Sequence, residues 1–106
     1  MAWLCLLVAG VLETLWAYAM KLSDGFTRPL ATAVTLIAMV LSVGLLGLAM
    51  RSLPLGTAYA VWTGIGTLGA FLLGILMLGE AATPMRLLAA GLILGGLVLM
   101  KLSSGE

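Results

Sequence analysis

The sequence has very little charge. Only 8% of its 106 residues are Asp, Glu, Lys or Arg, histidine is absent, and the formal net charge is +1. A soluble domain normally carries about 25% charged residues, so the composition excludes a water-soluble globule. The small net charge also gives no basic surface for a nucleic-acid partner. Hydrophobic residues make up 63% of the chain, which is typical of a protein whose solvent is lipid.

Reactive side chains are equally scarce. The single cysteine, Cys5, cannot form an internal disulfide and is interpreted as a small apolar filler. The polar residues contain no nucleophile, metal cluster or phosphate-binding loop from which an active site is built. We therefore expect no enzymatic activity, no metal and no cofactor.

Charged and turn-forming residues divide the chain into four apolar stretches. A bilayer core of about 30 Å requires roughly 20 apolar residues per helix. Pro29, Pro54 and Pro84 stand where three of the stretches begin, and proline suits the first turn of a helix. The sequence therefore predicts an all-α integral membrane protein in which residues 1–106 form one four-helix transmembrane domain. The expected helices cover approximately residues 2–20, 30–50, 55–78 and 84–102.

The basic residues are balanced between the two ends of these helices. If the N-terminus is cytoplasmic, Arg51 and Lys101 lie on the cytoplasmic side and Lys21, Arg28 and Arg86 on the other. The terminal amine makes the two sides equal, so the positive-inside rule favours neither orientation. Two outcomes remain open: insertion in both orientations with antiparallel pairing, or one orientation fixed by lipid or translocon.

Glu13 is the ionisable residue in the middle of an expected span. It lies about twelve residues into the first helix, near the bilayer midplane. An unpaired charge there costs about 2.5 to 3.5 kcal/mol on insertion scales, and every Lys and Arg lies at a helix end. Glu13 must therefore bind a proton or an external cation, and these two states exclude each other. The alternative is a permanently protonated Glu13 that hydrogen-bonds a neighbouring helix.

Residues at helical spacing suggest a pocket around this carboxylate. Gly10, Glu13 and Trp16 share one face of the first helix, which sets the carboxylate between a gap and an indole N–H donor. Ser42 is the polar residue near mid-depth of the second span and is expected to donate its hydroxyl to Glu13.

The third span adds aromatic groups and glycines. Tyr59 and Trp62 fall on one stripe, where their rings can attract a cation; the alternative is an interfacial aromatic belt. Gly64 and Gly66 soften the helix at mid-depth and are a possible hinge, although close helix packing explains them almost equally well.

Four short helices are too few to enclose a water-filled cavity with two gates. A second copy of the chain supplies the missing wall economically, and Gly91 and Gly95 form a small-xxx-small pair that suits a dimer contact. Two Glu13 side chains would then share one site and titrate as a coupled pair. One monovalent cation displacing two protons is the natural stoichiometry.

Several motifs together resemble the small multidrug resistance family over essentially the whole chain. They are Glu13 in the first of four spans, the loop from Lys21 to Arg28 (KLSDGFTR) and the run from Gly56 to Gly66 (GTAYAVWTGIG). Within that family, four residues are more similar to the guanidinium-exporter subtype than to the quaternary-ammonium subtype. These are Gly10, Trp16, Ser42 and Thr57.

The resemblance implies a multi-pass protein of the bacterial inner membrane that forms an antiparallel homodimer with dual topology. It further implies proton-coupled antiport of guanidinium-type cations by alternating access. Glu13 would bind guanidinium and protons, and Trp16 and Ser42 would orient its carboxylate. Tyr59 and Trp62 would line the pocket.

Two other functions remain open at this point. One is export of quaternary ammonium drugs by the same mechanism, and the other is a non-transporting membrane subunit with a structural Glu13. Guanidinium fits independently of the resemblance, because its planar fork of N–H donors matches a carboxylate edge. A quaternary ammonium has no N–H to donate.

Overall fold

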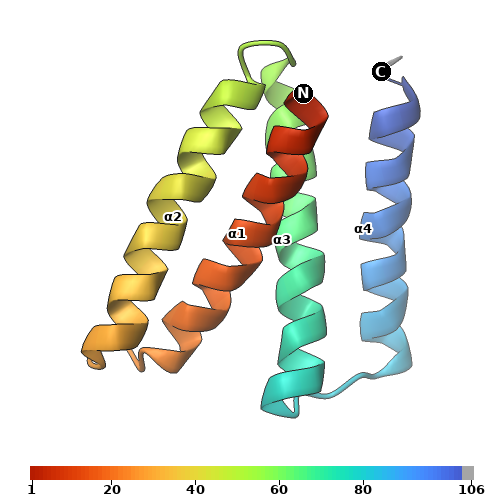
Figure 1. Ribbon diagram of the computed structural model, residues 1–106. Helices are drawn as coiled ribbons and strands as arrows, with labels where there is room; N and C mark the ends of the chain where they lie inside the picture. The colour runs from red at the N-terminus through yellow and green to blue at the C-terminus, as the bar shows by residue number, and fades with distance from the viewer. Residues whose placement is uncertain (104–106) are drawn as a thin grey trace.

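A computed structural model describes residues 1–103 as four helices joined by short turns (Figure 1). All four are long and apolar enough to cross a membrane, which confirms the predicted all-α, four-span fold. Successive helices run in opposite directions, so the start of α1, the end of α4 and the α2–α3 turn lie at one end of the molecule. The helices are α1 (Ala2–Leu22), α2 (Pro29–Ala49), α3 (Leu55–Leu78) and α4 (Pro84–Ser103).

The α1–α2 turn is organised by the buried hydroxyl of Ser23. Ser23 Oγ donates to the carbonyl oxygen of Met20 at 2.6 Å and accepts the backbone N–H of Phe26 at 3.1 Å. These bonds continue α1 to Leu22, two residues further than expected, before the chain reverses. The helix α2 then begins at Pro29, one residue earlier than expected, with the proline in its first turn.

The α3–α4 turn begins with a left-handed residue. Gly79 has φ = 71°, a conformation that costs glycine nothing. It allows the backbone N–H of Glu80 to bond the carbonyl oxygen of Gly74 at 2.9 Å. At the start of α4, Thr83 Oγ1 accepts the backbone N–H of Arg86 at 3.2 Å. The turn therefore has a defined shape.

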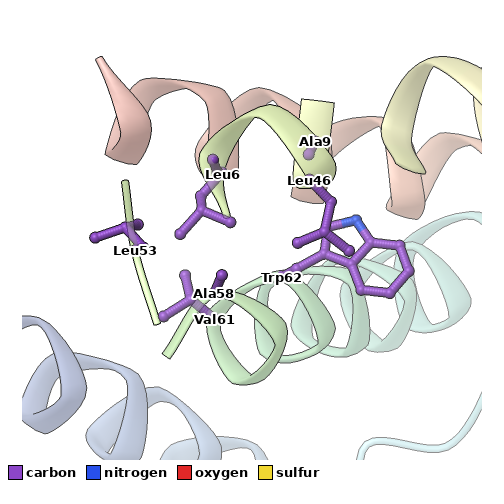
Figure 2. Packing of buried hydrophobic residues seen from close by; sticks show 8 residues of the cluster. Leu6, Ala9, Leu46, Leu53, Ala58, Val61 and Trp62 are labelled. Atoms are coloured by element: carbon purple, nitrogen blue, oxygen red, sulfur yellow. The ribbon is translucent and has the colours of Figure 1, made fainter. Parts of the chain in front are cut away.

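The core lies where α1, α2 and α3 meet. Large and small apolar side chains from the three helices point toward one another near the N-terminal end of α1 (Figure 2). The helix α4 packs along α3 and reaches α1 where Lys101 Nζ lies 4.8 Å from the ring centroid of Trp3, and none of its described residues is buried. The molecule is thus a three-helix unit with a fourth helix alongside it (Figure 1). The buried core residues shown in Figure 2 include Leu6, Ala9, Leu46, Leu53, Ala58, Val61 and Trp62.

Candidate functional site

The Glu13 side chain lies between α1 and α3 and is partly buried. Its Oε1 atom is buried and has no hydrogen-bond partner. A Cβ atom at Gly66 would overlap the carboxylate and would lie 2.7 Å from Glu13 Cγ. The carboxylate therefore packs directly on the backbone of α3, and it fits because residue 66 has no side chain.

One turn earlier, the helices approach closely at Gly10. A Cβ atom there would lie 2.5 Å from Ile65 Cγ2 and 2.6 Å from Ile65 Cβ. The space expected to be a gap beside the carboxylate is occupied by Ile65. Gly10 thus allows α3 to pack against α1, and this contact helps to set the distance between Glu13 and α3.

Ser42 joins three helices through its hydroxyl group. Its Oγ donates to the carbonyl oxygen of Ala9 on α1 at 2.7 Å and accepts Nε1–H of Trp62 on α3 at 2.9 Å. Ala9 lies one helical turn before Glu13. In this structure Ser42 therefore bonds the α1 backbone and the Trp62 indole, and the expected bond from Ser42 to Glu13 is replaced by these two. Its effect on the carboxylate passes through the α1 backbone.

Further polar atoms near mid-depth are buried without partners. Trp16 Nε1, on the turn after Glu13, is one of them, and Thr63 Oγ1 on α3 is another. Tyr59 is 53% exposed, and its ring centroid lies 5.6 Å from that of Trp62 at an interplanar angle of 50°. A buried polar group without a hydrogen bond costs about 1 to 3 kcal/mol. These groups are therefore donors and acceptors suited to a polar ligand.

Basic side chains lie far from Glu13 along the helix axes. Within residues 1–103 the ion pair joins Arg86 Nη2 to Glu80 Oε1 at 3.8 Å, at the α3–α4 turn. Lys21 and Arg28 flank the α1–α2 turn, and Arg51 follows α2. No described Lys or Arg is paired with Glu13, so its negative charge has no counter-ion within residues 1–103.

The glycines of α3 face different neighbours. The helix runs unbroken through Gly64, where a Cβ atom would lie 2.6 Å from Leu97 Cδ2 of α4. At Gly69 a Cβ atom would overlap Thr14 Oγ1 of α1. Close packing thus accounts for Gly64 and Gly66 in this conformation, and a hinge at these residues stays a prediction.

The small residues expected at a dimer contact face open space. Nothing lies within 4 Å of a Cβ atom at Gly91 or Gly95. Both positions border a shallow hollow on α4, and their role in a dimer stays a prediction.

Comparison with known proteins identifies the family. Residues 1–93 match the family model described as Small Multidrug Resistance protein. The chain belongs to the small multidrug resistance family. Proteins named "Guanidinium exporter" from Citrobacter freundii and Salmonella typhimurium are each 54% identical to it over 104 residues, covering 98% of this chain and 99% of theirs. One of the same name from Yersinia pseudotuberculosis is 55% identical, covering 98% of this chain and 100% of its own.

Membership in the small multidrug resistance family confirms the resemblance read from the sequence. It makes the chain a transporter rather than an enzyme, as predicted. Together with the four spans, it also makes the chain a multi-pass bacterial membrane protein.

Sequence reasoning missed one contact of this small multidrug resistance protein. Thr14 Oγ1 bonds the carbonyl oxygen of Gly10 at 3.2 Å, and its side chain packs on Gly69. Thr14 directly follows Glu13 on α1, and Gly69 lies one turn after Gly66 on α3. The Thr14–Gly69 and Glu13–Gly66 contacts therefore belong to the same interface between α1 and α3. The spacing of three in Gly66 and Gly69 was a usable signal, because it places two bare backbone positions on one helix face.

Proposed function

We propose that the protein exports guanidinium and small guanidinyl cations in exchange for protons, with Glu13 as the group that binds both. The observation that carries the proposal is the buried Glu13 Oε1, which has no hydrogen-bond partner and no basic residue to pair with. The curated relatives named "Guanidinium exporter", 54% identical over nearly the whole chain, support the choice of cation. The proposed location is the bacterial inner membrane.

The geometry favours a cation with N–H donors. A guanidinium ion offers a planar fork of donors that can bond a carboxylate edge in a bidentate manner. The unpartnered Thr63 Oγ1 is an additional acceptor at mid-depth, and the ring faces of Tyr59 and Trp62 can attract positive charge. A quaternary ammonium would leave these acceptors without donors, and that loss costs binding free energy.

Exchange follows from the two ways in which Glu13 can be neutralised. With a proton bound it has no attraction for a cation, and with a cation bound it has no site for a proton. If the occupied site opens to alternate sides, the downhill entry of protons drives the uphill exit of the cation. Alternating access is thus the mechanism that turns one carboxylate into an antiporter.

The proposed working unit is an antiparallel homodimer. The helix α4 packs mainly on α3 and has no buried residue in the described chain, so a large apolar surface is left for lipid or a second copy. The Lys and Arg residues are divided almost evenly between the two helix ends, which permits insertion in both orientations. Two copies of opposite orientation would bring two Glu13 side chains to one site near the midplane.

A flux measurement in liposomes tests the proposal. Purified protein is reconstituted in vesicles with an inward or outward proton gradient, and guanidinium movement is followed together with internal pH. We expect guanidinium to move in the direction opposite to proton flow. Glu13→Gln should abolish both fluxes. Glu80→Gln is the matched control, because it makes the same change at a side chain at the helix end that is 43% exposed, and it should retain the flux.

Three results would contradict the proposal. Guanidinium flux that persists in Glu13→Gln would show that transport does not require the Glu13 carboxylate. Guanidinium flux without proton movement would show that guanidinium transport is not coupled to protons. Rapid transport of lipophilic quaternary ammonium ions alone, with guanidinium immobile in the same vesicles, would assign the protein to multidrug export instead.

A further inference from the structure

A second cavity, separate from Glu13, lies at the end of the molecule where α1 ends and α4 begins. It measures about 350 Å³ and is bounded by the last turns of α1 and α3 and by the α3–α4 turn. On α1 it begins at Ala17, one turn beyond Glu13, and extends to Lys21. The transport mechanism proposed above uses none of its charged residues.

The charges around this cavity suit an anion. Lys21 and Arg86 both border it, and Glu80 is the one carboxylate among the residues that line it. Because Glu80 is paired with Arg86 at 3.8 Å, the lining carries a net charge of +1. A guanidinium ion is repelled by this arrangement, so the cavity is unsuited to serve as a vestibule for the exported cation.

Arg86 is held in place from three sides. Its guanidinium carbon lies 5.2 Å from the ring centroid of Phe71 on α3, and Nη1 donates to the carbonyl oxygen of Ala81 at 2.9 Å. The third contact is the ion pair with Glu80. Such a side chain is preorganised to bind a phosphate oxygen with its remaining donors.

An apolar groove continues from the cavity along the helices. It occupies about 170 Å³ between α3 and α4, and it shares Phe71 and Arg86 with the charged cavity. Its α4 side is formed by Ala89 and Ala90, whose short side chains leave room, and by Ile93 further along. A cavity that carries charged residues at the helix ends thus connects to an apolar groove that runs along α3 and α4.

We propose that this cavity and groove bind an anionic phospholipid, with the phosphodiester between Lys21 and Arg86 and one acyl chain along Ala89 and Ala90. The net charge of +1 matches the single negative charge of a phosphatidylglycerol headgroup. Basic pockets between transmembrane helices are sites at which anionic headgroups bind. At this end of the molecule, a lipid in the cavity would add a contact between the last turn of α1 and the first turn of α4.

Native mass spectrometry of the purified full-length chain tests the site. The protein in mild detergent is offered equal amounts of dioleoyl phosphatidylglycerol and dioleoyl phosphatidylcholine, and the bound ratio is measured. We expect the anionic lipid to be enriched, and Lys21→Gln to lower that enrichment about fivefold, as a basic residue near a lipid surface does. Lys21→Arg should restore the enrichment.

Arg28→Gln is the matched control. It removes one positive charge at the same end of the molecule, but Arg28 does not line the cavity, so the enrichment should stay unchanged. Ala89→Leu narrows the groove without changing charge and should lower the retention of both lipids. Arg86→Gln should act at least as strongly as Lys21→Gln, because it also releases Glu80.

The proposal is overturned by any of three results. Equal retention of the two lipids by the unaltered protein would show that the site has no preference for an anionic headgroup. Equal loss in Arg28→Gln and Lys21→Gln would mean that general surface charge is responsible. Displacement of the bound lipid by soluble glycerol phosphate at comparable concentration would mean that the groove holds no acyl chain. Each result is independent of guanidinium transport.

Discussion

The backbone of Gly66 on α3 lies directly against the carboxylate of Glu13 on α1. A Cβ atom at residue 66 would overlap Glu13 Oε1. The missing side chain therefore leaves the space that the carboxylate occupies between the helices. Gly66 is a positioning residue in this arrangement, and it acts without any side chain that could contact a ligand.

The first prediction concerns this contact. We expect Gly66→Ala to lower guanidinium transport about tenfold or more, because overpacking a tight interface costs about 1 to 3 kcal/mol and displaces the carboxylate. Vesicle flux of guanidinium is the measurement. Gly47→Ala is the control, since nothing lies within 4 Å of its Cβ position, and it should transport normally. Undiminished flux in Gly66→Ala would show that the position of the carboxylate is not set at this contact.

The second prediction concerns Ser42. Ser42→Ala leaves the Trp62 indole N–H unpartnered and removes the bond that joins α2 to the Ala9 carbonyl oxygen, so we expect the free energy of unfolding to fall by about 1 to 3 kcal/mol. Adding Trp62→Phe should then cost less than it does alone, because its bond to Ser42 is already lost. Unfolding in mixed detergent micelles measures both effects. The exposed Ser52 supplies the control: Ser52→Ala should change stability by less than about 0.5 kcal/mol. Additive losses would argue against the Ser42–Trp62 bond.

The third prediction concerns the seam at Gly69. Gly69→Ala places a methyl group on the Thr14 side chain, and we expect it to destabilise the protein by about 1 to 3 kcal/mol. Thr14→Ala removes the colliding γ atoms, so the double variant should recover part of that loss. Thermal unfolding of the three variants in one detergent gives the comparison. A double variant no more stable than Gly69→Ala would place the strain elsewhere.

The fourth prediction is a pH dependence that follows from competition at Glu13. A proton and a guanidinium ion bind the same carboxylate, so acid should weaken guanidinium binding. Once Glu13 is mostly protonated, the apparent Kd for guanidinium should rise about tenfold for each further unit by which the pH falls, for each proton displaced. Equilibrium binding by calorimetry over a series of pH values measures the slope, and a coupled pair of carboxylates makes it steeper than one. An affinity that does not change with pH would contradict the shared site.

The fifth prediction concerns assembly. Gly91→Ile and Gly95→Ile add bulk where nothing lies within 4 Å, so the fold of one chain should tolerate both. If these residues form the dimer contact, the variants should run as monomers in light-scattering analysis at concentrations where the unaltered protein is dimeric. Gly47→Ile on α2 is the control and should stay dimeric. Dimers of unchanged stability in both α4 variants would move the interface to another surface.

The fold was predictable because the signals that define it are local. Runs of apolar residues gave the four spans, and Pro29 and Pro84 lie in the first turns of α2 and α4. The end of α1 was two residues off, because the turn depends on side-chain bonds of Ser23 that apolar periodicity does not report. Glu13 could be singled out because a lone carboxylate within a span is rare.

The site was less predictable because its geometry depends on which helices touch. Sequence places Ser42 at mid-depth, but only the packing of α1, α2 and α3 determines that its hydroxyl bonds Ala9 and Trp62. The same applies to Gly10, whose open side is filled by Ile65 from another helix. Spacing along one helix gives the face of a residue, and the partner on that face comes from tertiary structure.

The position of α4 at the margin of the three-helix unit has a consequence for biogenesis. The contacts among α1, α2 and α3 are complete once residue 78 has entered the bilayer, so this unit can assemble while the rest of the chain is still being translated. The last helix then packs along α3 and adds the contact of Lys101 with Trp3 of α1. A chain truncated after the third span should accordingly already form the Ser42 bonds to Ala9 and Trp62.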